Sequence, residues 1–118
     1  MIDAIRQFFR AKPARPLPAV PLGERIYAIG DVHGRLDLFA KLVAAVERDD
    51  AARGSADTTI VLLGDLVDRG PDSAGVLAAA RALQERRKTR IIAGNHEEMF
   101  LRCFNDVELL RHFLRYGG

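Results

Sequence analysis

The sequence predicts an α/β fold with a parallel sheet, built in the order strand, helix, strand, helix, strand, helix, helix. Three short apolar runs end in glycine: RIYAIG at 25–30, TTIVLLG at 58–64 and TRIIAG at 89–94. Such nearly continuous apolarity is typical of strands that are buried on both faces. Helical periodicity separates the runs, and this alternation favours right-handed βαβ units.

Two helices are expected between the strands, and two more after them. Apolar residues recur at helical spacing over 36–46 and over 76–83. The Pro-Asp-Ser sequence at 71–73 favours a helix start directly before the second of these. The segments HEEMFLRCF at 96–104 and VELLRHFLRY at 107–116 predict the last two helices.

The first 23 residues predict two segments outside this fold. Residues 1–12, MIDAIRQFFRAK, have the spacing of a short amphipathic helix that docks on the domain, frays or lies on a membrane surface. Four prolines between 12 and 21 make residues 13–23 a semi-rigid linker. The globular domain is therefore expected at residues 24–118.

Length and composition indicate a single soluble domain. The chain has 118 residues and a net charge of +2, and its arginines form no basic stripe, so nucleic-acid binding has no support. No apolar run is long enough for a transmembrane segment. The single cysteine, Cys103, cannot form an internal disulfide, which favours a reducing compartment and predicts a cytoplasmic location.

Polar motifs follow all three predicted strands. They are GDVHGR at 30–35, GDLVDRGP at 64–71 and GNHEE at 94–98. Parallel strands finish at one edge of the sheet, and open α/β sheets bind ligands at that edge. The motifs bring seven polar side chains to it: Asp31, His33, Asp65, Asp68, Arg69, Asn95 and His96.

The residue types predict a metal site. Carboxylate, imidazole and amide ligands suit manganese, iron or zinc, and the lack of a cysteine in these three motifs disfavours a thiolate zinc site. Two metal ions that act together need a bridging carboxylate. Asp65, after the middle strand, is the natural bridge.

Two further side chains suit phosphate chemistry. Arg69 offers a fork of N–H donors for phosphate oxygens. His96 beside Asp68 is a plausible general acid, because a nearby carboxylate stabilises the imidazolium. Taken singly, the acids and Asn95 could be helix caps, and Asp68 with Arg69 a turn ion pair. Three such motifs at one edge favour the metal site.

As a set, GDVHG, GDLVDRG and GNHE resemble the calcineurin-like metallophosphoesterases. The DRG sequence is similar to that of the bacterial serine/threonine phosphoprotein phosphatases, a branch that also includes diadenosine tetraphosphate hydrolases. The resemblance covers residues 25–118. It implies an α/β/β/α sandwich of two sheets, of which this chain would form the parallel βαβαβ N-terminal half.

The resemblance also implies ligands and roles. It implies that Asp31, His33 and Asp65 bind a first divalent ion, and that Asp65 and Asn95 bind a second. Manganese is the first expectation, with iron or zinc as alternatives. A hydroxide that bridges the two metals is the implied nucleophile.

For catalysis, the resemblance implies that His96 protonates the leaving oxygen, with Asp68 as its partner. It further implies that Arg69 holds the phosphate. The expected activity is hydrolysis of phosphoric monoesters, first of all of phosphoserine and phosphothreonine in proteins. Small phosphate esters, and dinucleoside polyphosphates in particular, are the alternative substrates.

The chain departs from the family pattern after the third motif. The family adds later histidine ligands and a second arginine, whereas only His112 follows here, on the predicted helix at 107–116. We therefore expect an incomplete domain with exposed apolar sheet surface that could self-associate. A further alternative is a catalytically incomplete fragment that only binds a metal or a partner.

Overall fold

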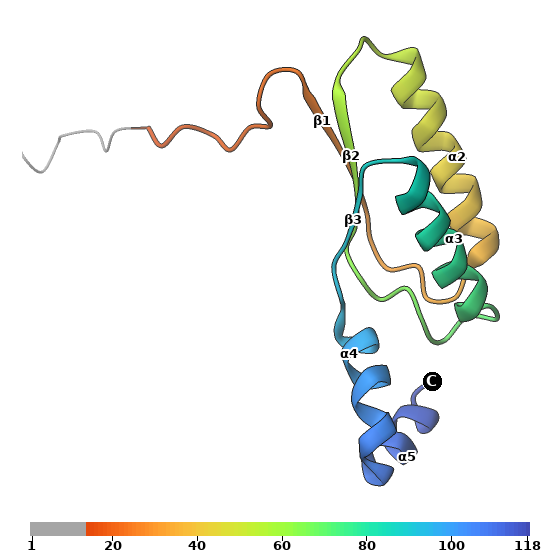
Figure 1. Cartoon of the computed structure of the whole chain (residues 1–118). Helices are drawn as coiled ribbons and strands as arrows, with labels where there is room; N and C mark the ends of the chain where they lie inside the picture. The colour runs from red at the N-terminus through yellow and green to blue at the C-terminus, as the bar shows by residue number, and fades with distance from the viewer. Residues whose placement is uncertain (1–13) are drawn as a thin grey trace, which may run out of the picture.

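A three-stranded parallel sheet forms the centre of the molecule. The computed structural model describes residues 14–118, so the helix predicted at 1–12 lies outside the described residues. The strands β1 (Glu24–Ile29), β2 (Asp57–Leu62) and β3 (Thr89–Ile91) lie in the order β1-β2-β3 (Figure 1). The predicted α/β fold with a parallel sheet is confirmed. Residues 14–20 precede it without helix or strand.

Two helices cover one face of this sheet. The helices α2 (Leu36–Ala52) and α3 (Ser73–Arg86) make the two crossovers, and both lie on the same side (Figure 1). Both crossovers move across the sheet in the same direction. Crossovers that share this direction and the same handedness place their helices on the same face of the sheet. The covered face holds the main hydrophobic core.

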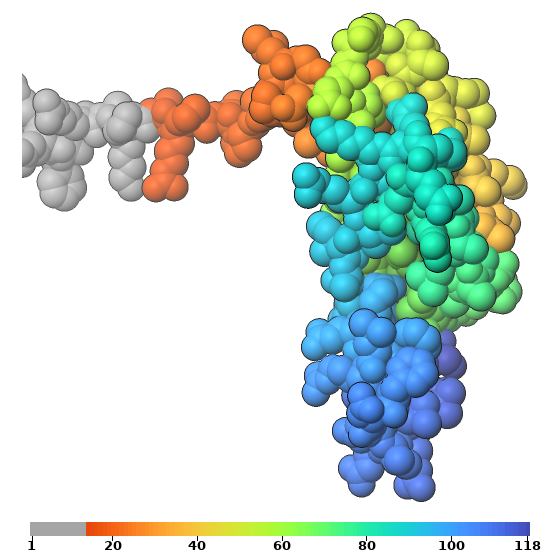
Figure 2. Space-filling view, in the orientation of Figure 1, coloured from red at the N-terminus to blue at the C-terminus, as the bar shows by residue number. Residues whose placement is uncertain are grey.

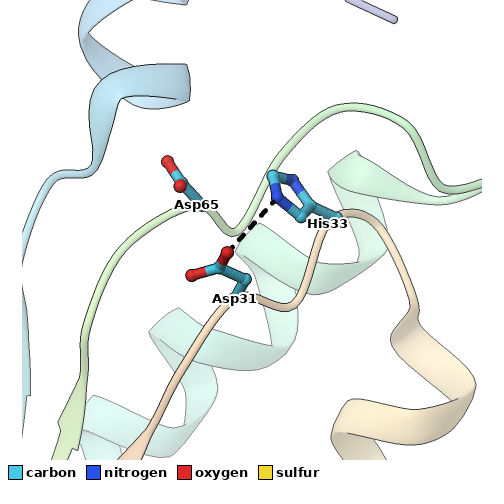
Figure 3. A group of neighbouring side chains, drawn as sticks. All are labelled: Asp31, His33 and Asp65. Atoms are coloured by element: carbon cyan, nitrogen blue, oxygen red, sulfur yellow. Dashed lines mark ion pairs between the residues drawn. The ribbon is translucent and has the colours of Figure 1, made fainter.

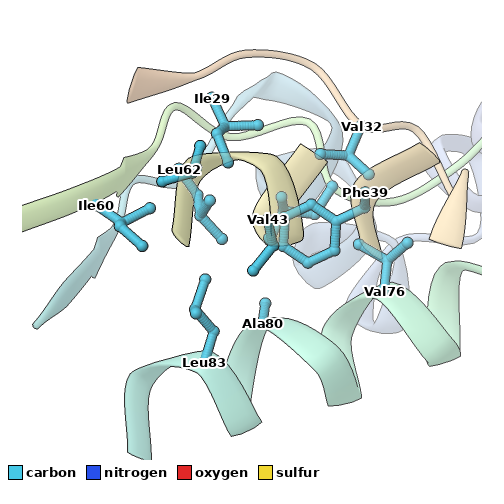
Figure 4. Close-up of a cluster of buried hydrophobic side chains, with 11 residues drawn as sticks. Ile29, Val32, Phe39, Val43, Ile60, Leu62, Val76, Ala80 and Leu83 are labelled. Atoms are coloured by element: carbon cyan, nitrogen blue, oxygen red, sulfur yellow. The ribbon is translucent and has the colours of Figure 1, made fainter. Parts of the chain in front are cut away.

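The core lies between the sheet and these two helices (Figure 4). The strand residues Ile60 and Leu62 are 0% exposed, and Phe39 of α2 and Leu83 of α3 pack against the same cluster. Their spacing follows the alternation of a strand and the turn of a helix. This packing sets the position of the strand ends that carry the polar motifs.

The opposite face of the sheet is open. Ile26, Leu63 and Ile92 are 49%, 49% and 51% exposed. They alternate along the chain with residues that face the helices, so they share the uncovered side. The expectation of exposed apolar sheet surface is confirmed.

The third strand is shorter than predicted. The apolar run extends to Gly94, but β3 ends at Ile91. The Ile92 N–H still donates to the Leu62 carbonyl at 2.9 Å, after which β2 also ends. Residues 92–94 therefore form the turn into the next helix instead of extending the strand.

The last helices form a separate hairpin. α4 (Asn95–Arg102), the 3-10 turn η1 (Cys103–Asn105) and α5 (Val107–Arg115) make a lobe at the carboxyl end of the strands (Figures 1 and 2). Its interior contains Cys103 and Phe113, which are 5% and 6% exposed. None of the described helices is both long enough and apolar enough to cross a membrane.

An ion-pair network closes the other end of the sheet. Asp50, near the end of α2, accepts hydrogen bonds from Thr58 at 2.7 Å, Arg87 at 2.6 Å and Arg25 at 2.6 Å. These contacts hold the Asp50 pKa far below its usual range. The network joins the helix to β1, β2 and the segment before β3.

Candidate metal and phosphate site

The first two strand-end motifs bring three ligand-type side chains together. One ligand atom from each of Asp31, His33 and Asp65 lies within 4.8 Å of the others (Figure 3). The His33 Nε2 atom is 3.7 Å from Asp31 Oδ2. This is the one group of three acidic, histidine or cysteine ligands that residues 14–118 assemble. It contains the three residues expected to bind the first metal.

Backbone hydrogen bonds join the two loops that carry these side chains. The Asp65 carbonyl accepts the N–H groups of Val32 and His33, at 3.0 and 2.9 Å. Gly34 has a φ of +66°, and a Cβ there would lie 2.9 Å from the Gly70 carbonyl carbon. Gly34 thus permits the close approach of the two loops, whereas a Cβ on Gly30 would meet open space.

The tautomer of His33 follows from its neighbour. Its Nδ1 atom lies 3.0 Å from the Val67 carbonyl oxygen, which can only accept a hydrogen bond. Nδ1 therefore carries a proton, and Nε2, which lies 3.7 Å from Asp31 Oδ2, is the ring nitrogen left to bind a cation. A ring oriented in this way by a carbonyl is typical of histidines that bind metals.

The second and third motifs meet in a buried pair. His96 Nδ1 lies 2.9 Å from Asp68 Oδ2, and the two residues are 8% and 6% exposed. The His96 ring stands edge-on to His33, with centroids 4.8 Å apart. The structure thus places the expected acid pair directly beside the three-ligand group.

Asp65 connects this group to the start of α4. Its Oδ1 atom accepts the N–H of His96 at 3.0 Å, and its carboxyl group packs against Gly94. Asn95, the first residue of α4, is exposed beside this contact. Part of the capping interpretation therefore holds for Asp65, but its second oxygen stays available for a ligand.

Residues outside the three-ligand group cap the helices α3 and α5. Asp72 accepts the N–H of Gly75 at the start of α3, and Asp106 serves α5. No side chain caps α2: Arg35, at the N-cap position, has no acceptor atom, and its guanidinium pairs with Asp37 at 2.8 Å. Asp31 is therefore not required as a cap and remains free for another role.

Arg69 lies at the edge of a pocket of about 180 Å³ that Asn95 and His96 also line. Its side chain is exposed and its backbone N–H donates to the Gly117 carbonyl at 2.8 Å. His112 also lines this pocket and is not part of the three-ligand group. The arginine can thus reach a phosphate held beside His96.

Strained backbone is concentrated at this site. In the described part of the chain, the residues other than glycine with positive φ are His33, Asp65, Asp68 and Arg69. Such conformations cost roughly 1–3 kcal/mol each and persist where the surroundings enforce them. All four residues belong to the predicted site, and the loop hydrogen bonds enforce their conformations.

Sequence reasoning missed Glu97. Its carboxylate accepts four backbone N–H groups, those of Asp65, Leu66, Val67 and Gly94, at 2.6 to 3.2 Å. Burial raises the Glu97 pKa, but these four donors outweigh it, so the pKa lies below its ordinary value of 4.5. A glutamate at the third position of a helix was the available signal for the contact with Gly94, but the other three partners lie some thirty residues away.

The donor set fits a divalent cation. Two carboxylates and an imidazole with a free Nε2 converge, and these are ligands for manganese, iron or zinc. Asp65 belongs to this group and also contacts the start of α4, where Asn95 lies, and a second ion would need such a shared carboxylate. The arrangement has the composition of a metal-dependent site for phosphate hydrolysis.

Comparison with known proteins gives the family. The model of the calcineurin-like phosphoesterases matches residues 24–118, so this chain belongs to that family of metallophosphoesterases. A symmetrical bis(5'-nucleosyl)-tetraphosphatase of Klebsiella pneumoniae (strain 342) is 41% identical over 81 residues, 69% of this chain and 26% of the relative. A zinc-dependent endopolyphosphatase of Saccharomyces cerevisiae is 32% identical over 84 residues, 70% of this chain and 24% of the relative.

A solved structure is similar to this chain in fold and sequence. The crystal structure of a proposed diadenosine tetraphosphatase superposes with a TM-score of 0.57 at 28% identity, covering 79% of this chain and 38% of that one. The chain spans about a quarter of the length of the curated relatives that it matches, 26% and 24% for the two above. The expected family and fold are confirmed.

Proposed function

We propose that this chain provides metal-binding and phosphate-binding residues for the hydrolysis of dinucleoside polyphosphates. The observation that carries the proposal is the convergence of Asp31, His33 and Asp65 beside the buried pair of His96 and Asp68. The substrate class follows from the relatives, which are named as a tetraphosphatase and an endopolyphosphatase. Both names refer to substrates that contain a chain of phosphates. They support the dinucleotide alternative better than the phosphoprotein substrate expected first.

The proposed metal ligands are Asp31, His33, Asp65 and Asn95. Divalent ions at these ligands would neutralise phosphate charge and lower the pKa of a water molecule that attacks phosphorus. The protein's own contribution is orientation. The Val67 carbonyl fixes the His33 ring, and Glu97 fixes the loop that carries Asp65.

Arg69 and His96 act on the phosphate chain. Arg69 binds oxygens of a phosphate beside the one attacked, through its paired N–H donors. As the new bond from water oxygen to phosphorus forms, the bond from phosphorus to the bridging oxygen breaks. His96 then donates a proton to that leaving oxygen, and Asp68 orients its ring through Nδ1.

The test is hydrolysis by the purified 118-residue chain. Diadenosine tetraphosphate and a phosphoserine peptide are incubated with the chain and manganese or zinc, and products are separated by anion-exchange chromatography. Asp65→Asn removes the proposed bridging ligand. Asp57→Asn is the matched control, because Asp57 pairs with Lys88 at the opposite end of the sheet.

We expect release of ADP that requires added metal, is abolished by Asp65→Asn and is unchanged by Asp57→Asn. Faster release of phosphate from the peptide would overturn the proposal in favour of a phosphoprotein phosphatase. No hydrolysis above the Asp65→Asn variant would also overturn it. Metal or partner binding without catalysis would then be the remaining function.

A further inference from the structure

The pocket beside His96 has two unlike walls. One part of its lining, here called the first wall, comes from the strand-end loops and α4, and the other, the second wall, comes from the α5 region. The first consists of Asp68, Arg69, Asn95, His96 and Met99, and the second of His112, Phe113 and Tyr116. The first wall belongs to the proposed phosphate site. The second wall is aromatic and takes no part in the chemistry described above.

The aromatic wall is tied to the phosphate wall through the end of α5. Gly117 has a φ of +97°, and the N–H of Gly118 donates to the Phe113 carbonyl at 3.1 Å, as in a Schellman motif. This turn directs the Gly117 carbonyl to the N–H of Arg69, at 2.8 Å. The distance between the arginine turn and the aromatic residues is therefore set by the fold before any ligand binds.

The aromatic residues offer an open ring surface. The rings of His112 and Tyr116 lie one helical turn apart, with centroids at 4.5 Å and planes at 44°. Tyr116 is 58% exposed, so its ring is accessible from the pocket. Aromatic side chains next to a cationic phosphate-binding residue are the combination with which proteins bind a nucleotide by stacking and charge.

We propose that this pocket binds a nucleoside of the substrate, with its base stacked on Tyr116 and His112 while Arg69 binds the adjoining phosphate. The volume of about 180 Å³ is smaller than the roughly 300–1,000 Å³ of sites that enclose a whole ligand, so it suits one ring system of a dinucleotide. This inference rests on the proposed function and assigns its nucleoside subsite.

The chain offers a direct probe of stacking. It contains two tyrosines and no tryptophan. Tyr27 lies on β1, where its hydroxyl donates to Asp49 at 2.5 Å, far from the strand ends that carry the site. In a Tyr27→Phe variant with isotope-labelled tyrosine, the ring signals in a nuclear magnetic resonance spectrum come from Tyr116 alone.

The experiment titrates this metal-free variant with ADP and, separately, with inorganic tripolyphosphate. We expect ADP to move the Tyr116 ring signals upfield through the ring current of the base, and tripolyphosphate to leave them in place. By calorimetry, Tyr116→Ala should weaken ADP binding about fivefold or more and tripolyphosphate binding less than about twofold. Tyr116→Phe keeps the ring and should restore ADP affinity.

Phe104→Ala is the matched control. Phe104 is an aromatic residue of the same hairpin, is 70% exposed and does not line the pocket, so its removal should leave ADP affinity unchanged. Absence of a ring-current shift, or equal loss of ADP and tripolyphosphate affinity in Tyr116→Ala, would overturn the inference. Hydrolysis of diadenosine tetraphosphate with no such shift refutes the nucleoside subsite alone. Absence of hydrolysis refutes the proposed function.

Discussion

Replacement of Glu97 by glutamine tests what holds the candidate site in place. The Oε2 atom accepts the N–H groups of Asp65 and Gly94, and Oε1 accepts those of Leu66 and Val67. Glutamine has a single oxygen, so its amide group must face two of these N–H donors. Those two donors lose their acceptor without any change in side-chain size.

The expected cost follows from these contacts. A buried donor without a partner costs about 1–3 kcal/mol, so two fully buried donors would cost about 2–6 kcal/mol. Glu97 is only partly buried, and water can serve one donor in part. We therefore expect a loss of about 2–3 kcal/mol, a large share of the roughly 5–15 kcal/mol that stabilises a domain.

The loss should depend on pH. The Glu97 pKa lies below its ordinary value of 4.5, so the stability that its ionised form contributes is fully present above that value and is lost as the pH falls through the native pKa. Glutamine does not titrate. The difference in unfolding free energy between the wild-type chain and Glu97→Gln should therefore be largest near neutral pH and shrink in acid.

The assay is urea unfolding followed by circular dichroism, with Glu98→Gln as the matched control. Glu98 is adjacent in sequence, but its side chain is exposed and pairs with the exposed Arg102 at 3.5 Å, so its replacement should change stability by less than about 0.5 kcal/mol. Manganese affinity, measured by calorimetry, should fall about 10–100-fold in Glu97→Gln and stay unchanged in the control. Equal stability and equal metal affinity of the two variants would refute the reasoning.

Three further predictions concern the ion-pair network, the end of α5 and the metal. The hydrogen bond from Thr58 and the neighbouring arginines hold the Asp50 pKa far below its ordinary 3.8. Asp50→Asn should therefore lower the melting temperature at pH 7, and the loss should shrink as the pH falls below about 4. A difference in melting temperature between wild type and variant that stays the same across this pH range would contradict the prediction. Gly118→Ala places a Cβ against the Phe113 ring and should speed amide exchange in α5, and unaltered exchange would show that the ring has room to move. Manganese at a hundred times its dissociation constant should stabilise the chain against unfolding by about 2.7 kcal/mol, and chelation should reverse this. If manganese stabilised His33→Ala by the same amount, His33 would be excluded as a ligand.

The sheet edge illustrates how far sequence reasoning reaches. Parallel strands that end at one edge predicted that seven polar side chains lie there, and the resemblance to the calcineurin-like metallophosphoesterases implied that three of them, Asp31, His33 and Asp65, bind one ion. The pairing of Asp68 with His96 was also anticipated, and the structure brings these side chains together at 2.9 Å. Sequence order and strand direction predicted the edge on which these residues lie, and the family resemblance supplied the ligand set.

Other contacts could not be anticipated in the same way. The role of Glu97 depends on a loop some thirty residues earlier in the chain. The contact between Gly117 and Arg69 requires the Schellman turn to direct a carbonyl group toward a residue with positive φ. The early end of β3 depends on where its partner β2 stops.

The amino-acid sequence by itself determined the alternation of strands and helices and the side chains at the sheet edge, because period and residue type are local properties. Only the tertiary structure decided which of those side chains meet, how the His33 ring is oriented and which wall faces Arg69. These features depend on distances between loops, which the packing of α2 and α3 against the sheet and the docking of α5 set. The physical reason is that hydrogen bonds and ligand geometry change over tenths of an ångström, whereas a sequence pattern specifies only which face or end a residue occupies.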